Sequence, residues 1–222
     1  GKAQFGEVNI PSAIIAQGRG APLSIVGVII GKAPESFLSF EEKGIRKPKD
    51  VEGKRFAVAS GAAIMVVWPA FAKLVGIDIS KTTHIPVEAA VQAAAFFSGQ
   101  VDWMPGFRPG TDEPVILRAR KEGKKLVFVR WEDYGWKVYG SGIVVHRDTL
   151  KNDPKMVADF VSATMDGHAY AVEHPEEAVN ILLRTNPEGD REHGRLGTLF
   201  MLDALLTKAA PEKGIGYMEE DR

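Results

Sequence analysis

The feature that most constrains the fold is the regular alternation of two kinds of apolar pattern. Short apolar stretches alternate with stretches of helical periodicity, and glycine or proline separates them. Leu23–Ile30 is a nearly continuous apolar run, typical of a strand buried on both faces. Ala62–Val75 follows with apolar residues at helical spacing and stops at Gly76. Strands that alternate with helices of about ten residues predict an α/β layered fold.

The same patterns give the expected elements along the chain. Strands are predicted at residues 5–8, 23–30, 55–59, 84–87, 101–104, 126–129 and 142–146. Helices are predicted at residues 12–17, 62–75, 88–98 and 113–122, and then at 154–173, 175–185 and 193–208. The chain therefore ends in an almost wholly helical tail.

The order of these elements predicts two lobes. Residues 48–130 hold a complete small α/β unit, so we expect them to form lobe 2. Residues 1–47 and 131–222 are expected to combine into lobe 1, with crossovers near Ile45–Lys54 and Trp131–Tyr139. Ligands of such folds bind at the carboxyl ends of strands, often between domains.

Composition excludes several classes of function. The 222 residues carry 28 basic and 29 acidic side chains, a net charge of −1, which is no basic excess for holding nucleic acid. Apolar stretches such as Ala62–Phe71 are far shorter than the roughly 20 residues that span a bilayer, so no membrane insertion is expected. The chain contains no cysteine, which excludes disulfides, thiolate metal sites and cysteine nucleophiles.

Two polar segments at predicted strand ends are candidate ligand-binding sites. Ser60, Gly61 and Ala62 join a strand to a helix, where backbone N–H groups attract an anionic or electron-rich group. An ordinary serine cap beside a tight turn is the alternative. Glu7 and Asn9 follow the first strand, and the Glu7 carboxylate would accept hydrogen bonds from an amino-heterocycle. For Glu7 a solvated loop position is equally compatible with the sequence.

Aromatic residues gather near strand ends and the second crossover. Trp103, Trp136 and Tyr139 are candidates for stacking on a planar ligand, and Trp103 is expected to be partly exposed in an open, empty form. Trp68 has helical spacing and is predicted to lie in the core, and Trp131 is interpreted in the same way. Asp102 is either a ligand contact or a structural turn acid.

The sequence shows no catalytic set, metal site or cofactor motif. His168 and His174 are six residues apart, a spacing unlike that of metal-binding helices. Gly18-Arg-Gly20 lacks the third glycine of a dinucleotide fingerprint. We therefore predict no catalytic residues, no metal and no cofactor, and we expect a protein that is not an enzyme.

Several motifs, in order, resemble a known family. Phe5-Gly6 with the following Ala16–Pro22 is similar to its "ADFG…A…G.P" opening, and Gly44–Lys54 to its "GI..P.DLKGK" signature. Ser98–Asp102 resembles "SGqvDA", and His174–Ala178 resembles "HPEEA". The family comprises the SsuA- and TauA-like periplasmic substrate-binding proteins for nitrate, sulfonates, taurine and thiamine-pyrimidine precursors, which serve ABC importers.

The resemblance implies a type II periplasmic-binding-protein fold, with two crossovers at a hinge and a ligand cleft between the lobes. It implies an extracytoplasmic, periplasmic solute-binding protein that takes a small planar or anionic ligand, pyrimidine-like, sulfonate or aromatic acid. Its partner would be the membrane permease of an ABC transporter, and we expect a monomer. Family members begin with a further strand and helix and continue past Met218, so truncation is expected at both ends.

Two other functions stay open at this point. One is an enzyme on the same fold, similar to pyrimidine synthases of thiamine biosynthesis, although those carry a cysteine-rich iron motif. The other is the ligand-sensing domain of a larger receptor. A full-length sequence with a leader peptide favours the transporter component, and fused signalling domains favour the receptor.

Overall fold

The structure of the protein is a computed structural model that describes residues 3–59, 61–207 and 209–219. The chain forms two compact units, Gly1–Ala33 with Lys137–Arg222 (unit 1) and Pro34–Trp136 (unit 2). The sequence predicts unit boundaries at residues 47/48 and 130/131 instead. They differ because a strand within residues 34–47 pairs inside the sheet of unit 2, and because Trp131 is fully buried in the core of that unit.

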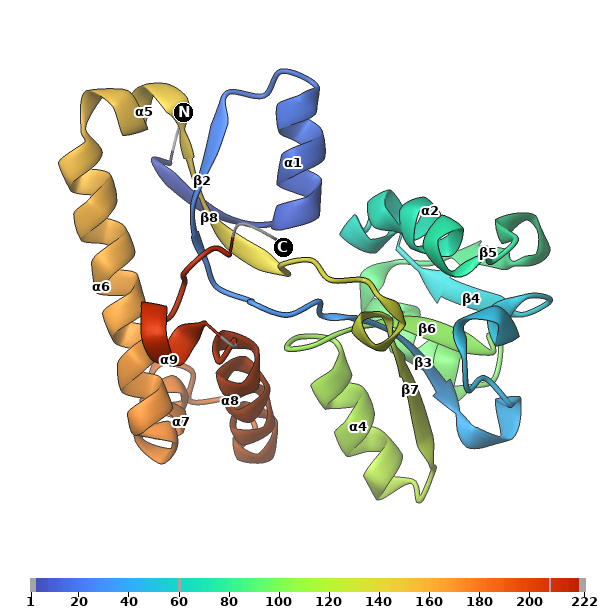
Figure 1. Ribbon diagram of the computed structural model, residues 1–222. Helices are drawn as coiled ribbons and strands as arrows, with labels where there is room; N and C mark the ends of the chain where they lie inside the picture. The colour runs from blue at the N-terminus through green and yellow to red at the C-terminus, as the bar shows by residue number, and fades with distance from the viewer. Residues whose placement is uncertain (1–2, 60, 208, 220–222) are drawn as a thin grey trace. The chain divides into compact units, whose positions relative to one another are not determined.

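Unit 1 contains a three-stranded antiparallel sheet in the order β1-β8-β2 (Figure 1). Its strands come from both ends of the chain, as the sequence analysis expects. The strands are β1 (Phe5–Asn9), β2 (Leu23–Val28) and β8 (Ser141–His146). The helices are α1 (Ile10–Gly18), α5 (Arg147–Asn152), α6 (Pro154–Glu173), α7 (Pro175–Thr185), α8 (Arg191–Leu205) and α9 (Ala210–Lys213).

Unit 2 contains a five-stranded mixed sheet in the order β5-β4-β6-β3-β7. The strands are β3 (Glu35–Phe40), β4 (Arg55–Val58), β5 (Thr83–Pro86), β6 (Trp103–Phe107) and β7 (Leu126–Arg130). The helices are α2 (Ala63–Val75), α3 (Gln92–Phe97) and α4 (Asp112–Lys121). Short 3₁₀ turns are η1 (Glu41–Lys43), η2 (Pro48–Val51), η3 (Ile79–Lys81), η4 (Ala89–Val91) and η5 (Trp131–Tyr134).

The core of unit 2 has two layers, one on each face of the sheet. Alternate strand residues point to opposite faces, so Phe56 and Val58 face α2 while Ala57 lies among residues of α3 and α4. The layer under α2 is rich in aromatic rings and includes Trp68, as the sequence predicts. The helices of unit 2 thus cover both faces of its sheet.

Two strands differ from expectation. β3 is not anticipated by the sequence, because Glu35, Ser36 and Ser39 interrupt its apolar residues, yet the whole strand is buried between β6 and β7. β6 starts at Trp103 and runs to Phe107 rather than spanning residues 101–104. The other predicted strands lie within two residues of their observed bounds, and Leu23–Ile30 and Arg55–Ala59 belong to different sheets, as predicted.

Candidate functional site

The strands of unit 2 bring several loops to one edge of the sheet. β4 is parallel to β5 and β6, while β3 is antiparallel to both β6 and β7. The carboxyl ends of β4, β5, β6 and β7 therefore share one edge. β4 leads into α2 on one face, and its neighbour β6 leads into α4 on the other face. Such a topological switch point is where open α/β sheets bind ligands.

Two segments border this switch point. The first is loop 59–62, which leads into α2; Ser60 lies outside the described residues. Gly61 is exposed and has φ +80°, a backbone conformation that favours glycine. Ala62 is the N-cap of α2, and no side chain among the described residues caps this helix. At the start of this 13-residue helix the Met65 N–H donates to the Ala62 carbonyl at 2.9 Å. N–H groups at a helix start attract an electron-rich group, which is the prediction made for this segment.

The second segment is the turn Phe107–Thr111 between β6 and α4, which we call the 107–111 turn. The Thr111 N–H donates to the Phe107 carbonyl at 2.9 Å, and the Phe107 N–H donates back to Thr111 Oγ1 at 2.9 Å. The Gly110 N–H donates to both carboxylate oxygens of Glu113, at 3.0 and 2.8 Å. These bonds give the turn a defined shape.

A buried ion pair lies beneath the 107–111 turn. Asp112 is 1% exposed; it accepts the Phe107 N–H at 3.0 Å, and its other oxygen lies 3.3 Å from Arg108 Nε. The Arg108 guanidinium also lies over the Phe128 ring, 4.9 Å from its centroid. Burial raises the pKa of Asp112 to about 6. The positive charge of Arg108 lowers this pKa, and the negative charge of Glu113 raises it further.

Arg108 and Asp112 are not among the residues that the sequence predicts for the site. The available signal was the run Phe107-Arg-Pro-Gly-Thr-Asp-Glu-Pro114, in which turn residues and two acids stand between a strand and a helix. Acidic residues in the first turn of a helix are common, so this run alone indicated a helix start. Asp112 is buried beside Gly106 and Ser36, and Ser36 belongs to β3, the strand that the sequence does not predict.

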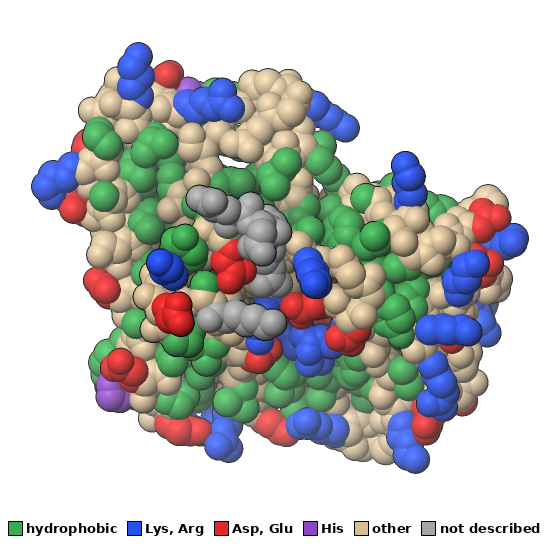
Figure 2. Space-filling view, viewed as in Figure 1, with side chains coloured by type: hydrophobic (Ala, Val, Ile, Leu, Met, Phe, Trp, Pro, Cys, Tyr) green, Lys and Arg blue, Asp and Glu red, His purple; other side chains and the backbone are tan. Residues whose placement is uncertain are grey.

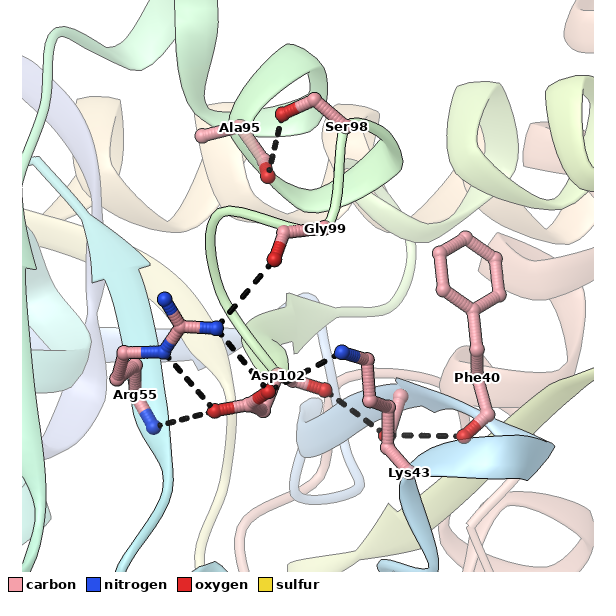
Figure 3. A network of polar contacts seen from close by, with 8 residues as sticks. Phe40, Lys43, Arg55, Ala95, Ser98, Gly99 and Asp102 are labelled. Atoms are coloured by element: carbon pink, nitrogen blue, oxygen red, sulfur yellow. Dashed lines mark hydrogen bonds and ion pairs between the residues drawn. The ribbon is translucent and has the colours of Figure 1, made fainter.

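Asp102 has structural partners, in line with one of its two interpretations. Its carboxylate accepts the Arg55 N–H at 2.9 Å and pairs with Arg55 Nε at 3.3 Å and Lys43 Nζ at 3.2 Å (Figure 3). Its carbonyl accepts the Ser39 hydroxyl at 3.0 Å. Burial raises the pKa of Asp102, but the hydrogen bonds from Arg55 and Lys43 outweigh burial and hold it below its ordinary value. The network joins the starts of β4 and β6, away from the switch point.

Trp103 lies in the core, and the expectation that it is partly exposed is wrong. Its side chain is 1% exposed and stacks on Phe56 with centroids 4.3 Å apart. β6 turns residue 103 toward the α2 face, where the space is filled by other rings. Trp136 is half-buried and packs edge-on against Trp131 at 5.9 Å. Trp131 is fully buried, in agreement with its core interpretation.

The candidate residues of unit 1 have local structural partners. Asn9 caps α1 by accepting the Ser12 N–H at 3.1 Å, and its amide donates to the Gly140 carbonyl at 3.2 Å. Tyr139 is buried against Ile10 and Val28, and its hydroxyl accepts the Glu219 N–H. The cap of α1 and the buried phenol both stabilise unit 1.

Glu7 is exposed and accepts the Ser141 hydroxyl at 2.7 Å. It borders a hollow of about 350 Å³ inside unit 1, together with the stacked rings of Phe5 and Phe160 and with His168. The imidazole of His168 is hydrogen-bonded to the Thr164 carbonyl at 2.8 Å. The hollow combines apolar walls with one carboxylate and one imidazole.

Two further findings concern the described residues as a whole. Within residues 3–59, 61–207 and 209–219, no cluster of three His, Asp or Glu side chains could hold a metal ion. The helices of the same residues include none with the length and apolar character needed to cross a membrane. On the face shown in Figure 2, acidic and basic side chains are interspersed.

Curated relatives match most of this chain at low identity. A 4-amino-5-hydroxymethyl-2-methylpyrimidine phosphate synthase of Legionella pneumophila is 24% identical over 85% of this chain and 58% of its own length. A formylaminopyrimidine-binding protein of Halalkalibacterium halodurans is 21% identical over 81% of this chain and 54% of its own length. The chain therefore spans little more than half the length of these relatives.

A solved structure shows the same fold. The periplasmic aliphatic sulphonate binding protein SsuA from Escherichia coli superposes with a TM-score of 0.69 at 20% identity, covering 84% of this chain and 62% of SsuA. The α/β architecture with two sheets is thus that of periplasmic binding proteins. A family model described as "NMT1/THI5 like" matches residues 1–178, which is most of the chain. The protein accordingly belongs to the NMT1/THI5-like family.

Proposed function

We propose that the protein is the solute-binding component of an ABC importer and that its ligand binds at the switch point of unit 2. The observation that carries this proposal is that the uncapped start of α2 and the 107–111 turn follow the neighbouring strands β4 and β6 at one edge of the sheet. The fold shared with SsuA supports the same class of function.

The proposed ligand is a small planar or anionic organic molecule. The helix N-terminus at Ala62 favours an anionic or electron-rich group. The names of the relatives include an aminopyrimidine, a formylaminopyrimidine and sulphonates. We further propose that the two units close over the ligand. The protein would be a periplasmic monomer that delivers its ligand to a membrane permease.

A thermal-shift panel tests the proposal with formylaminopyrimidine, 4-amino-5-hydroxymethyl-2-methylpyrimidine and an alkanesulfonate as probes. At 100 times the dissociation constant, binding stabilises the native state by roughly 2.7 kcal/mol. For a chain of this size the melting temperature then rises by about 5–10 °C.

The site is tested with Ala62→Phe, which places a ring at the start of α2. Ala70→Phe is the matched control, because Ala70 is exposed further along the same helix. Ala62→Phe should abolish the shift, whereas Ala70→Phe should retain it. An equal shift in both variants would contradict the proposed position of the ligand.

A second candidate function is synthesis of a pyrimidine phosphate, favoured by the Legionella relative. This chain has no cysteine, so any such chemistry would use other residues. Mass spectrometry of the compound recovered after incubation separates the two functions. Recovery of the unchanged probe supports the binding protein, and a chemically altered compound formed over many turnovers supports the enzyme.

A further inference from the structure

His84 of β5 contacts the backbone at the end of the neighbouring strand β4. β5 is an edge strand of the unit 2 sheet and runs parallel to β4, with His84 opposite Phe56. The Nε2 atom of His84 lies 3.1 Å from the carbonyl oxygen of Val58, the last residue of β4. Because a carbonyl oxygen only accepts hydrogen bonds, Nε2 carries the hydrogen and donates it. A side chain of the edge strand is thus hydrogen-bonded to the last carbonyl of β4.

A row of stacked rings holds the imidazole in this orientation. His84, Phe56 and Trp103 occupy matching positions on β5, β4 and β6. The imidazole lies nearly parallel to the Phe56 ring, with centroids 5.1 Å apart and an angle of 23° between the planes. Phe56 stacks in the same way on Trp103, at 4.3 Å and 14°, and both of these rings are buried. The row therefore anchors the half-buried imidazole to the core of unit 2.

The backbone bond between the two strands is long at this point. The Val87 N–H donates to the same Val58 oxygen at 3.4 Å, beyond the roughly 2.7–3.2 Å that is usual for such bonds. Val87 follows the last residue of β5, so this bond is at the end of the ladder. Of the two bonds that the described residues donate to the Val58 carbonyl, the one from His84 is shorter.

The Val58 carbonyl belongs to the peptide group that leads from β4 toward α2. This planar group joins Val58 to Ala59, and the Ala59 carbonyl accepts the Ala62 N–H at 3.1 Å. Ala62 is the N-cap of α2. The orientation of the peptide plane after Val58 therefore sets the direction in which the chain leaves the sheet, and with it the position of the helix start.

We propose that His84 is a positioning residue for the start of α2, acting through its hydrogen bond to the Val58 carbonyl. Without this donor the end of β4 separates from β5 more often, while the rest of the sheet stays folded. The inference rests on the proposed function only for its consequence in binding. A helix start that must be ordered when the ligand arrives binds it with lower affinity than one held in place beforehand.

Two substitutions separate the hydrogen bond from the packing of the ring. His84→Phe keeps a ring against Phe56 but has no N–H to donate, whereas the amide of His84→Gln keeps a donor and removes the ring. Hydrogen exchange with mass spectrometry measures the helix start directly and without a ligand. Peptides that cover residues 61–66 should exchange roughly fivefold faster in His84→Phe, the effect of one lost hydrogen bond. In His84→Gln they should exchange within about twofold of the unaltered protein.

Thr83→Phe is the matched control, because it introduces the same ring one residue earlier on β5, where the side chain is exposed. It should leave the 61–66 peptides unchanged. Peptides of α4 should exchange equally in all of these proteins, which shows that unit 2 remains folded. Unchanged exchange of the 61–66 peptides in His84→Phe would overturn the proposal. Faster exchange in His84→Gln than in His84→Phe would also overturn it, because that order is expected of a ring that only packs.

The consequence for binding is measured separately, with any probe of the thermal-shift panel that binds the unaltered protein. The dissociation constant of that probe should rise in His84→Phe and return toward the unaltered value in His84→Gln. An unchanged dissociation constant in His84→Phe would contradict the link between His84 and the ligand. A panel in which no probe binds would refute the proposed function instead, and the exchange rates would still decide whether His84 positions the helix start.

Discussion

Replacing Trp103 by alanine should destabilise unit 2 rather than weaken a ligand contact. The indole is 1% exposed, stacks on Phe56 at 4.3 Å and lies 4.7 Å from the Phe37 ring. Removing a buried Trp side chain costs about 3–5 kcal/mol. Each lost aromatic pair contributes up to about 1 kcal/mol. A loss near 5 kcal/mol is a large part of the total stability of a typical protein, about 5–15 kcal/mol.

Trp103→Phe provides a graded comparison. It keeps an aromatic ring against Phe56 and removes an indole N–H that has no hydrogen-bond partner among the described residues. Because deleting an unsatisfied buried donor offsets part of the lost packing, we expect a cost of about 1–2 kcal/mol. Tyr134→Ala is the surface control, since Tyr134 is 37% exposed, and should change stability by less than about 1 kcal/mol.

Urea denaturation followed by tryptophan fluorescence measures this effect in unit 2 alone. All four tryptophans, at positions 68, 103, 131 and 136, belong to unit 2. The midpoint should fall steeply in Trp103→Ala and slightly in Trp103→Phe. The reasoning would be refuted by a Trp103→Ala protein that unfolds within 1 kcal/mol of the unaltered protein and has lost its ligand.

Three further substitutions test the structural assignments by denaturation. Asp102→Asn should lower the free energy of unfolding by about 2 kcal/mol at pH 7. This loss should shrink as the pH falls below 3.8, the ordinary pKa of Asp, because a carboxylate with a lowered pKa stabilises the fold only while it is charged. A loss that does not depend on pH would contradict this reasoning. Gly106→Ala should cost about 1–3 kcal/mol through its collision with Asp112 and Ser36, and a neutral effect would show that the space is not filled. Asn9→Ala should cost about 1 kcal/mol by uncapping α1, with Asn9→Asp as the variant that restores the cap.

The pH dependence of Asp112 has the opposite sign from that of Asp102. Its pKa in the folded protein is about 6, above the ordinary value of 3.8, so the native state takes up a proton that the unfolded chain has already lost. This group therefore stabilises the fold fully below pH 3.8, and the contribution is lost as the pH rises through about 6. Asp112→Asn should flatten the stability profile between pH 4 and 7.

Much of unit 1 followed from local signals. Helices α6 and α7 match the predicted ranges 154–173 and 175–185 because Pro154 and Pro175 stand at their first positions and Asp153 caps α6. Strand β8 was visible as an apolar stretch. These signals are local, since a cap or a proline acts within one helical turn.

The candidate site was predictable only in part. The start of α2 near Ala62 could be predicted, because an apolar strand, a glycine and an apolar stretch of helical periodicity follow one another in the sequence. The position of the 107–111 turn at the same edge of the sheet depends on which strands are neighbours. Pairing of β4 with β6, four elements later in the chain, brings the two segments to one edge of the sheet.

Local sequence patterns predict the α/β class, the alternation of strands and helices and the burial of Trp68, because hydrophobic periodicity and helix caps depend on residues close together in the chain. Three other features depend on contacts between distant residues: Trp103 packs in the core, Asp102 pairs with Arg55, and β3 lies between β6 and β7. A strand residue can point to either face of its sheet, and its strand can pair with different neighbours. The local sequence does not specify which face will be buried. Register and strand order settle that choice, and both arise from contacts between residues distant in sequence.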